Sequence, residues 1–177
     1  IPLLGVLYFF AFLDRVNVGF AALTMNVDLG LSSAVFGLGV GIFFVGYTLF
    51  EIPSNVLLER FGARVWIARI MLSWGALSAS MAFVQGPTSF YVVRFLLGVA
   101  EAGFFPGMLL YLTYWFPFEQ RGKIIAAFMM AIPLSSVIGA PISTALLDVS
   151  ILGLAGWQTM FLVEALPGRI DAVTVAR

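Results

Sequence analysis

Five long apolar stretches, separated by short polar segments, run through this sequence. A helix that crosses a membrane needs about 20 mostly apolar residues to span about 30 Å of hydrocarbon. Stretches of this length lie at residues 1–26, 34–57, 65–84, 90–115 and 124–147. The pattern predicts an all-α membrane protein, because a helix satisfies its own backbone hydrogen bonds in lipid.

The segments between these stretches are short, which predicts tight helical hairpins with polar loops at 26–33, 59–64, 85–89, 117–123 and 148–156. A sixth apolar segment, 157–166, is too short to span and meets Pro167 and Gly168, so we expect its helix to stop there. The predicted domain is a six-helix bundle over 1–166, with a polar tail at 167–177. That tail fits either a chain cut inside its sixth helix or a shifted reading frame.

The composition excludes several classes of protein. Hydrophobic residues make up 62% and charged residues 10% of the chain, against roughly 45–50% and about 25% in a soluble domain. Nine basic residues balance nine acidic ones, so no basic excess points to nucleic acid. The chain has no Cys and no His, and its one lysine, Lys123, lies in a polar segment. We therefore expect no metal, no cofactor and no enzymatic activity; a membrane enzyme built on Ser, Thr, Asp or Glu is the remote alternative.

Lys and Arg in the short loops predict the orientation of the helices, because such residues concentrate on the cytoplasmic side. The second loop carries Arg60 and Arg64 and the fourth carries Arg121 and Lys123, whereas the other three carry none. We expect loops 59–64 and 117–123 to be cytoplasmic. The first residue is Ile1 and the first methionine lies inside the first apolar stretch, so we also expect a fragment of a longer protein.

Small residues and prolines indicate how the spans pack. Glycines in the second and fourth spans predict close approach of helix backbones: Gly37, Gly39, Gly41, Gly46, Gly98, Gly103 and Gly107. Pro106, Pro133 and Pro141 are expected to kink the fourth and fifth helices.

Several ionisable side chains lie inside the predicted spans, and the candidates among them are Asp14, Arg15, Glu51, Arg94 and Glu101. Each costs roughly 2.5–3.5 kcal/mol at the centre of a membrane helix, even on a lenient insertion scale. They are expected to face the interior of the bundle or a water-filled cavity. Intramembrane charge of this kind is a functional-site hypothesis by default.

Arg94 and Glu101 are seven residues apart, so they share one helix face at a separation of about 10.5 Å along the axis. We expect Glu101 near mid-membrane and Arg94 near an outer vestibule. Asp14 and Arg15 point about 100° apart, so each needs a partner on another helix. Opposite charges of the first and fourth spans are therefore expected to meet across a cavity.

A guanidinium held out of water suits a carboxylate, because its planar fork matches two oxygens and stays charged. Arg15 and Arg94 are thus candidate anion-binding residues, and Asp14 and Glu101 are candidate proton carriers. Structural salt bridges are the alternative for these four residues.

Three polar groups nearby are weaker candidates. Tyr47 could donate a hydrogen bond into the cavity or serve only in packing, and Asn17 lies one turn beyond Asp14 on the first span. Glu51 lies toward the cytoplasmic end, where a structural role beside arginines is favoured.

Three motifs together resemble a known family. FLDRVN at 12–17, GYTLFEIPSN at 46–55 and RFLLGVAEAG at 94–103 resemble the anion:cation symporter family of the major facilitator superfamily. This family includes bacterial tartrate, phthalate, hexuronate and galactonate carriers. The resemblance extends to residue 166 and implies a twelve-helix fold of which this chain supplies the N-terminal half.

The resemblance also implies roles for the charged residues. The arginine matching Arg15 contacts the substrate carboxylate, and the acids matching Asp14 and Glu101 take part in proton coupling. The arginine matching Arg94 pairs with the acid of the fourth helix or helps admit substrate, and the tyrosine matching Tyr47 lines the site.

The superfamily's conformational loop motif is matched loosely by NVLLERFGAR at 55–64. Glu59, Arg60, Gly62 and Arg64 occupy motif positions, with Glu59 in place of Asp, while the motif's first glycine and one of its arginines are missing. The resemblance implies that this loop helps to hold one conformation of the transporter, and the departures from the motif imply that it does so with a different strength here.

Together these observations predict transport of an organic anion by proton symport in a bacterial inner membrane, with the missing C-terminal half and the lipid bilayer as partners. The expected coupling ion is H+. A sodium-coupled or uncoupled exchanger of the same fold and a non-functional gene fragment are the alternatives.

Overall fold

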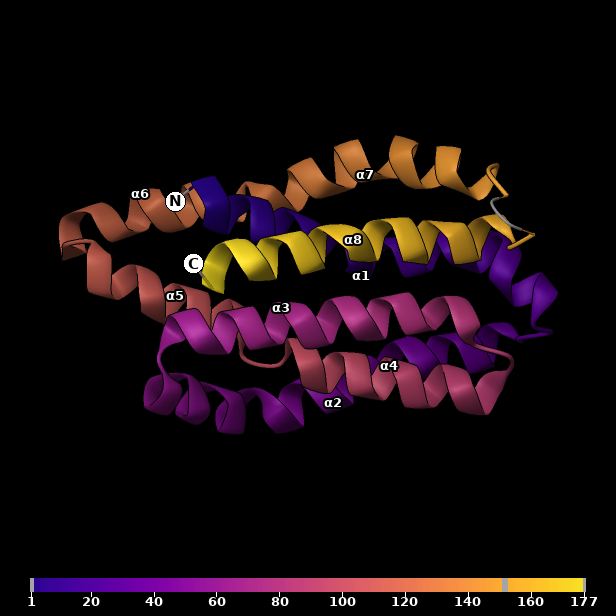
Figure 1. Cartoon of the computed structure of the whole chain (residues 1–177), viewed down its shortest axis with the longest axis horizontal. Helices are drawn as coiled ribbons and strands as arrows, with labels where there is room; N and C mark the ends of the chain where they lie inside the picture. The colour runs from indigo at the N-terminus through magenta and orange to yellow at the C-terminus, as the bar shows by residue number, and fades with distance from the viewer. Residues whose placement is uncertain (1, 151–152, 177) are drawn as a thin grey trace.

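The computed structural model describes residues 2–150 and 153–176, and in that part of the chain every regular element is helical (Figure 1). The helices are α1 (Pro2–Asp28), α2 (Ser33–Phe61), α3 (Ala63–Ser80), α4 (Pro87–Glu101), α5 (Phe104–Trp115), α6 (Phe118–Met129), α7 (Ala131–Leu147) and α8 (Gly156–Ala176), with a 3-10 turn η1 at Met81–Phe83. Most of them run along the long axis of the molecule. The predicted all-α fold is confirmed.

The predicted spans coincide with these helices. Four helical stretches among the described residues are long and apolar enough to cross a membrane: Ser33–Phe61, Ala63–Phe83, Pro87–Trp115 and Phe118–Leu147. They match the second to fifth predicted spans, and α1, with 27 residues, covers the first.

Two of the predicted polar loops are largely helical instead. Gly62 alone separates α2 from α3, and its φ of 86° lies in the left-handed region that favours glycine. The segment predicted as a loop at 117–123 contains the start of α6, which begins at Phe118. Glu, Gln, Arg and Lys are good helix formers, so their polarity marks where a helix leaves the hydrocarbon and not where the helix ends.

The fourth and fifth spans are each broken close to a predicted proline. Ala102 and Gly103 separate α4 from α5, and Met130 separates α6 from α7. Pro106 and Pro133 are each the third residue of the following helix, so the carbonyls they leave without a partner lie at the breaks. The helix α7 passes through Pro141 without interruption.

The helix α8 continues beyond the predicted stop. Its backbone is helical from Gly156 to Ala176 and passes through Pro167. At 21 residues it is long enough to span a bilayer. Proline is tolerated within membrane helices because neighbouring groups can satisfy the freed carbonyl, so the expected end at Leu166 is corrected.

The helices pack in two groups that α3 connects. One group contains α2 and α4, and the other contains α1, α7 and α8; α3 lies against both α4 and α8 (Figure 1). Gly98 of α4 sits where an added Cβ would meet the backbone of Phe43, and Gly46 of α2 faces the backbone of Phe95. Close approach is also seen at Gly39, Gly103 and Gly107, but not at Gly37 or Gly41.

Replacing Gly98 by Ala is expected to destabilise the bundle by about 1–3 kcal/mol, because the new methyl group meets backbone atoms that cannot move aside. Thermal unfolding of the complete protein in detergent measures the effect. Gly41→Ala is the matched control, since nothing lies within 4 Å of a Cβ there. Equal melting temperatures for the two variants would contradict the close contact between α2 and α4.

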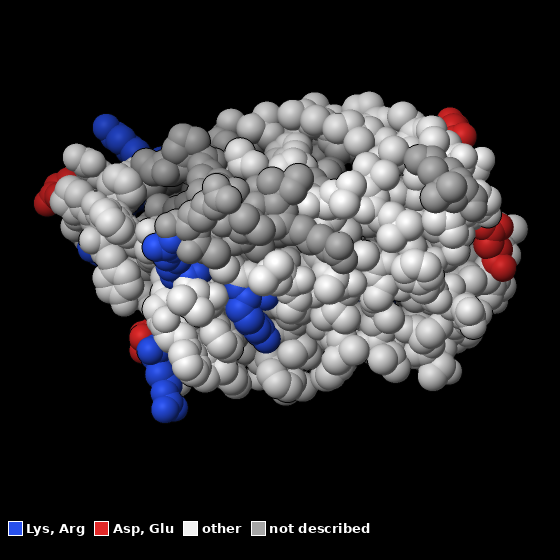
Figure 2. Space-filling model, viewed as in Figure 1, with Lys and Arg blue, Asp and Glu red and all other residues white. Residues whose placement is uncertain are grey.

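The two ends of the bundle differ in charge. The α2–α3 and α5–α6 connections and both chain ends lie toward one end of the molecule, and the α1–α2, α3–α4 and α7–α8 connections lie at the other (Figure 1). On the face that Figure 2 shows, the Lys and Arg side chains lie toward the first end, together with some acidic ones, and the charged side chains visible at the opposite end are acidic. This arrangement agrees with the alternation of loop charges in the sequence.

Candidate functional site

An ion pair joins the two helices that were predicted to share charges. Arg15 of α1 contacts Glu101, the last residue of α4: Nη2 lies 2.7 Å from Oε2, and Nε donates to the same oxygen at 2.8 Å. The prediction that acids and arginines of the first and fourth spans meet is therefore confirmed for this pair.

The two partners of the ion pair differ in burial. Glu101 is 2% exposed, and its Oε1 is buried with no hydrogen-bond partner among the described residues. The Arg15 side chain is 24% exposed. The geometry thus combines a partly exposed arginine side chain with a buried acceptor atom that could take a proton.

Aromatic rings of α2 cover the two guanidinium groups. The Arg15 guanidinium carbon lies 5.0 Å from the centre of the Tyr47 ring and 5.4 Å from that of Phe43. The Arg94 guanidinium carbon lies 4.7 Å from the centre of the same Phe43 ring. Phe43 therefore stands beside both cations, where contact with the ring face stabilises them.

Arg94 is not placed as predicted. It is 3% exposed, so it does not border an outer vestibule, and its Nε has no hydrogen-bond partner. Among the described residues it forms no ion pair with Glu101, which pairs with Arg15 instead.

Asp14 faces α3, which the sequence did not indicate. It is 3% exposed and accepts hydrogen bonds from Nε1 of Trp74, at 3.2 Å, and from the hydroxyl of Ser78. Asp14 is therefore held by two neutral donors, whereas its neighbour Arg15 points toward α4.

Asn17 does not join the group around Arg15. Its amide donates to Oε2 of Glu164 on α8, and its Oδ1 accepts from the hydroxyl of Ser143 on α7 at 2.6 Å. Asn17 is completely buried. Two residues along a helix correspond to a rotation of about 200°, which turns Asn17 away from the side of α1 that carries Arg15.

The residues of the conformational loop motif lie where α2 meets α3. Glu59 and Arg60 are exposed in the last turn of α2, Gly62 makes the turn, and Arg64 belongs to the first turn of α3. The Arg60 guanidinium lies 5.9 Å from the ring centre of Phe61. These residues sit at the end of the bundle and not in its interior.

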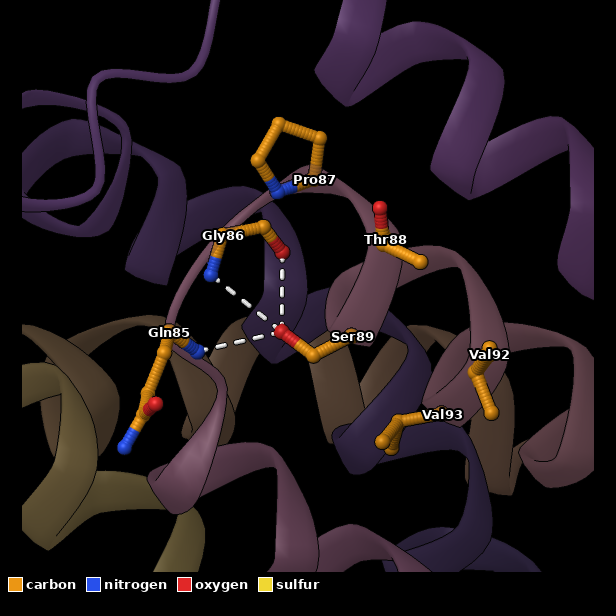
Figure 3. A pocket seen from close by; sticks show the side chains of 7 residues that line it. All are labelled: Gln85, Gly86, Pro87, Thr88, Ser89, Val92 and Val93. Carbon is orange, nitrogen blue, oxygen red and sulfur yellow. Dashed lines mark hydrogen bonds between the residues drawn. The ribbon is translucent and has the colours of Figure 1, made fainter.

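An open hollow at the α3–α4 connection is separate from the charged residues. Ser89 Oγ accepts from the backbone N–H groups of Gln85, at 3.1 Å, and Gly86, at 3.2 Å, and donates to the Gly86 carbonyl (Figure 3). The lining consists of Gln85, Gly86, Pro87, Thr88, Ser89, Val92 and Val93. Its polar groups satisfy one another as a helix cap, which gives a ligand little to bind.

Several residues at the site were missed from the sequence. Phe43, Trp74 and Ser78 belong to ordinary apolar or small-residue patterns and give no local signal. Glu164 did give one, because it is an acid within an apolar run. Glu164 is not among the predicted site residues because the apolar segment 157–166 is too short to span a membrane by itself.

One family profile matches nearly the whole chain, and its curated relatives have the names of transporters. The profile of the Major Facilitator Superfamily matches residues 4–176. A protein of Agrobacterium vitis named a putative tartrate transporter is 64% identical over 99% of this chain and 39% of its own length. The putative metabolite transport protein NicT of Pseudomonas putida is 58% identical over 94% of this chain and 39% of its own length.

The fold has a counterpart among solved structures. A bacterial homologue of the human lysosomal transporter Spinster, in an inward-facing and occupied conformation, superimposes with a TM-score of 0.88 at 21% identity. The match covers 98% of this chain and 42% of that chain. The chain thus spans about two-fifths of the length of the relatives that it matches.

Proposed function

The chain belongs to the major facilitator superfamily, and from this premise we propose that the complete protein carries an organic anion across the membrane together with a proton. Membership makes it part of a transporter and not an enzyme, and an integral membrane protein. Tartrate, a sugar acid or an aromatic acid is the proposed kind of substrate. The remaining three-fifths of the transporter would complete the site at the interface of the two halves.

The observation that carries the proposal is the ion pair between Arg15, whose side chain is partly exposed, and the buried Glu101. A substrate carboxylate and the Glu101 carboxylate compete for the same cation. Arg15 uses Nε and Nη2 toward a single oxygen of Glu101, and a planar substrate carboxylate can take two parallel hydrogen bonds from the fork in its place.

Binding and release of a proton switch Arg15 between Glu101 and the substrate carboxylate. Protonation of Glu101 at its unpartnered Oε1 removes the charge that holds Arg15 and leaves the guanidinium to the substrate. Loss of the proton on the other side of the membrane restores the ion pair and displaces the anion. Asp14, held by neutral donors near the same arginines, is proposed as a second acid that takes part in coupling.

The neighbouring residues have supporting roles in this proposal. Tyr47 would line the substrate site beside Arg15, since its ring already lies against the guanidinium. Arg94, which is buried and forms no ion pair among the described residues, would add positive potential that attracts the anion. No coupling ion other than H+ and no cofactor is proposed.

The orientation follows from the charge of the two ends. We propose that the end with the α2–α3 and α5–α6 connections is cytoplasmic, because it carries the loop arginines and the lysine. The proposed location is the inner membrane of a bacterium.

Coupling is tested by uptake of radiolabelled tartrate into cells that express the complete transporter. Accumulation is expected to persist in sodium-free medium and to be lost when a protonophore is added. Dependence on sodium would indicate sodium coupling, and accumulation that resists the protonophore would indicate exchange. Either result would contradict proton symport.

A further inference from the structure

A buried acid outside the Arg15–Glu101 pair has hydrogen-bond partners, and among the described residues it forms no ion pair. Glu164 of α8 is 6% exposed and contacts Asn17 of α1 and Ser143 of α7. The three side chains form a closed ring. Asn17 contacts Oε2 of Glu164, Ser143 lies 3.2 Å from its Oε1, and Ser143 contacts Oδ1 of Asn17 at 2.6 Å.

The number of hydrogen-bond donors in this ring indicates whether the Glu164 carboxyl group is charged or neutral. Three contacts need three donated hydrogens, one for each pair. The Asn17 amide supplies one and the Ser143 hydroxyl, which has a single hydrogen, supplies another. An ionised Glu164 supplies none, so one contact would place two acceptors against each other in a buried site. A protonated Glu164 supplies the third hydrogen, and the same count holds if the amide is turned over.

We propose that Glu164 is a proton-binding site separate from the Arg15–Glu101 pair, and that its proton closes a ring of hydrogen bonds that holds α1 against α7 and α8. In the proposed ring, protonated Oε1 of Glu164 donates to the Ser143 hydroxyl across the 3.2 Å contact, that hydroxyl donates to Oδ1 of Asn17, and the Asn17 amide donates to Oε2. The inference concerns packing and protonation, and it goes beyond the proposed transport function.

The charged groups around α8 favour the neutral acid. This helix packs against α1, α3, α7 and η1, of which α7 and η1 contain no charged residue. On α1, Asp14 acts on Glu164 as a second negative charge, Arg15 is paired with Glu101, and Asp28 accepts from Trp157 at the start of α8.

The two arginines of α3 lie toward its opposite end. Gln158 donates to the Ala82 carbonyl, which fixes the register of the two antiparallel helices. In that register Arg69 and Arg64 lie about 10 Å and about 18 Å along the axis from the level of Glu164. Arg69 stacks on Trp66, with 4.6 Å between its guanidinium carbon and the ring centre.

Infrared difference spectroscopy of the complete transporter in membranes tests the protonation state directly. Subtracting the spectrum of Glu164→Gln from that of the wild type at neutral pH is expected to reveal a carboxylic-acid C=O band that shifts down in D2O. A carboxylate band in its place would overturn the proposal. Glu119→Gln is the control, because Glu119 is exposed on α6 and its replacement should remove a carboxylate band.

Three variants test the ring itself. Asn17→Ala is expected to move the acid band to higher frequency, because the C=O loses its donor; an unmoved band would overturn the ring. Glu164→Gln retains one donor and one acceptor, so the melting temperature should stay near that of the wild type, whereas Glu164→Leu should lower it by several degrees. Equal losses of melting temperature in Glu164→Gln and Glu164→Leu would also contradict the proposed ring.

Discussion

Arg15→Lys in the complete transporter is expected to raise the KM for a carboxylate substrate about 10- to 100-fold, although the positive charge is retained. A lysine cannot offer two parallel hydrogen bonds to one carboxylate. The loss of one hydrogen bond to a charged group costs about 1.5–3 kcal/mol, and about 1.4 kcal/mol corresponds to a tenfold change in affinity. Initial rates of tartrate uptake over a range of concentrations measure the effect.

Arg69→Lys is the matched control for this substitution. Arg69 also lies within a membrane helix, but it stacks on Trp66 and takes no part in the ion pair. Its KM should change less than about twofold, which corresponds to less than 0.5 kcal/mol. Near-normal affinity in the Arg15→Lys variant would count against a carboxylate clamp at Arg15.

Glu101→Gln is expected to abolish proton-driven accumulation while it preserves exchange of substrate across the membrane. The amide can still accept a hydrogen bond from Arg15, but it cannot gain or lose a proton. Without the competing negative charge, substrate binding should be unchanged or tighter. Counterflow in preloaded proteoliposomes measures exchange, and uptake driven by an imposed pH gradient measures coupling.

The exposed acid Glu119 provides the comparison. Glu119→Gln removes a carboxylate of the same kind from the surface of α6 and should leave both activities intact. If Glu101→Gln still accumulates substrate against a gradient, the ion pair is structural and the proposed exchange does not occur there.

The sequence was sufficient for the architecture because its strongest signal, the length of each apolar stretch, depends only on the thickness of the bilayer. It failed where helices extend beyond the hydrocarbon, as at Phe118, and where a proline was taken as an end, as at Pro167. In both places a polar or proline residue was interpreted as the end of a helix, whereas the surrounding residues support a continuous helix.

The candidate site was predicted in part for a related reason. The burial of Asp14, Arg94 and Glu101 and the partial burial of Arg15 follow from the cost of charge in lipid, which one sequence reveals. The choice of partner depends on how each helix is rotated and shifted against the others. That information is not contained in any local stretch of sequence. The pairing of Glu101 with Arg15 was therefore one of several acid–arginine pairs that the sequence allowed. The contacts of Asp14 with Trp74 and Ser78 could not be predicted from the sequence.

The number of protons bound together with the substrate tests the central claim most directly. Isothermal titration calorimetry of the complete transporter with tartrate, in buffers that differ in ionisation enthalpy, measures this number. Binding to the wild type should take up a proton, because the anion displaces Glu101 from Arg15 and the freed carboxyl is buried. Binding to Glu101→Gln should take up about one proton fewer, and an equal uptake in both proteins would contradict the account.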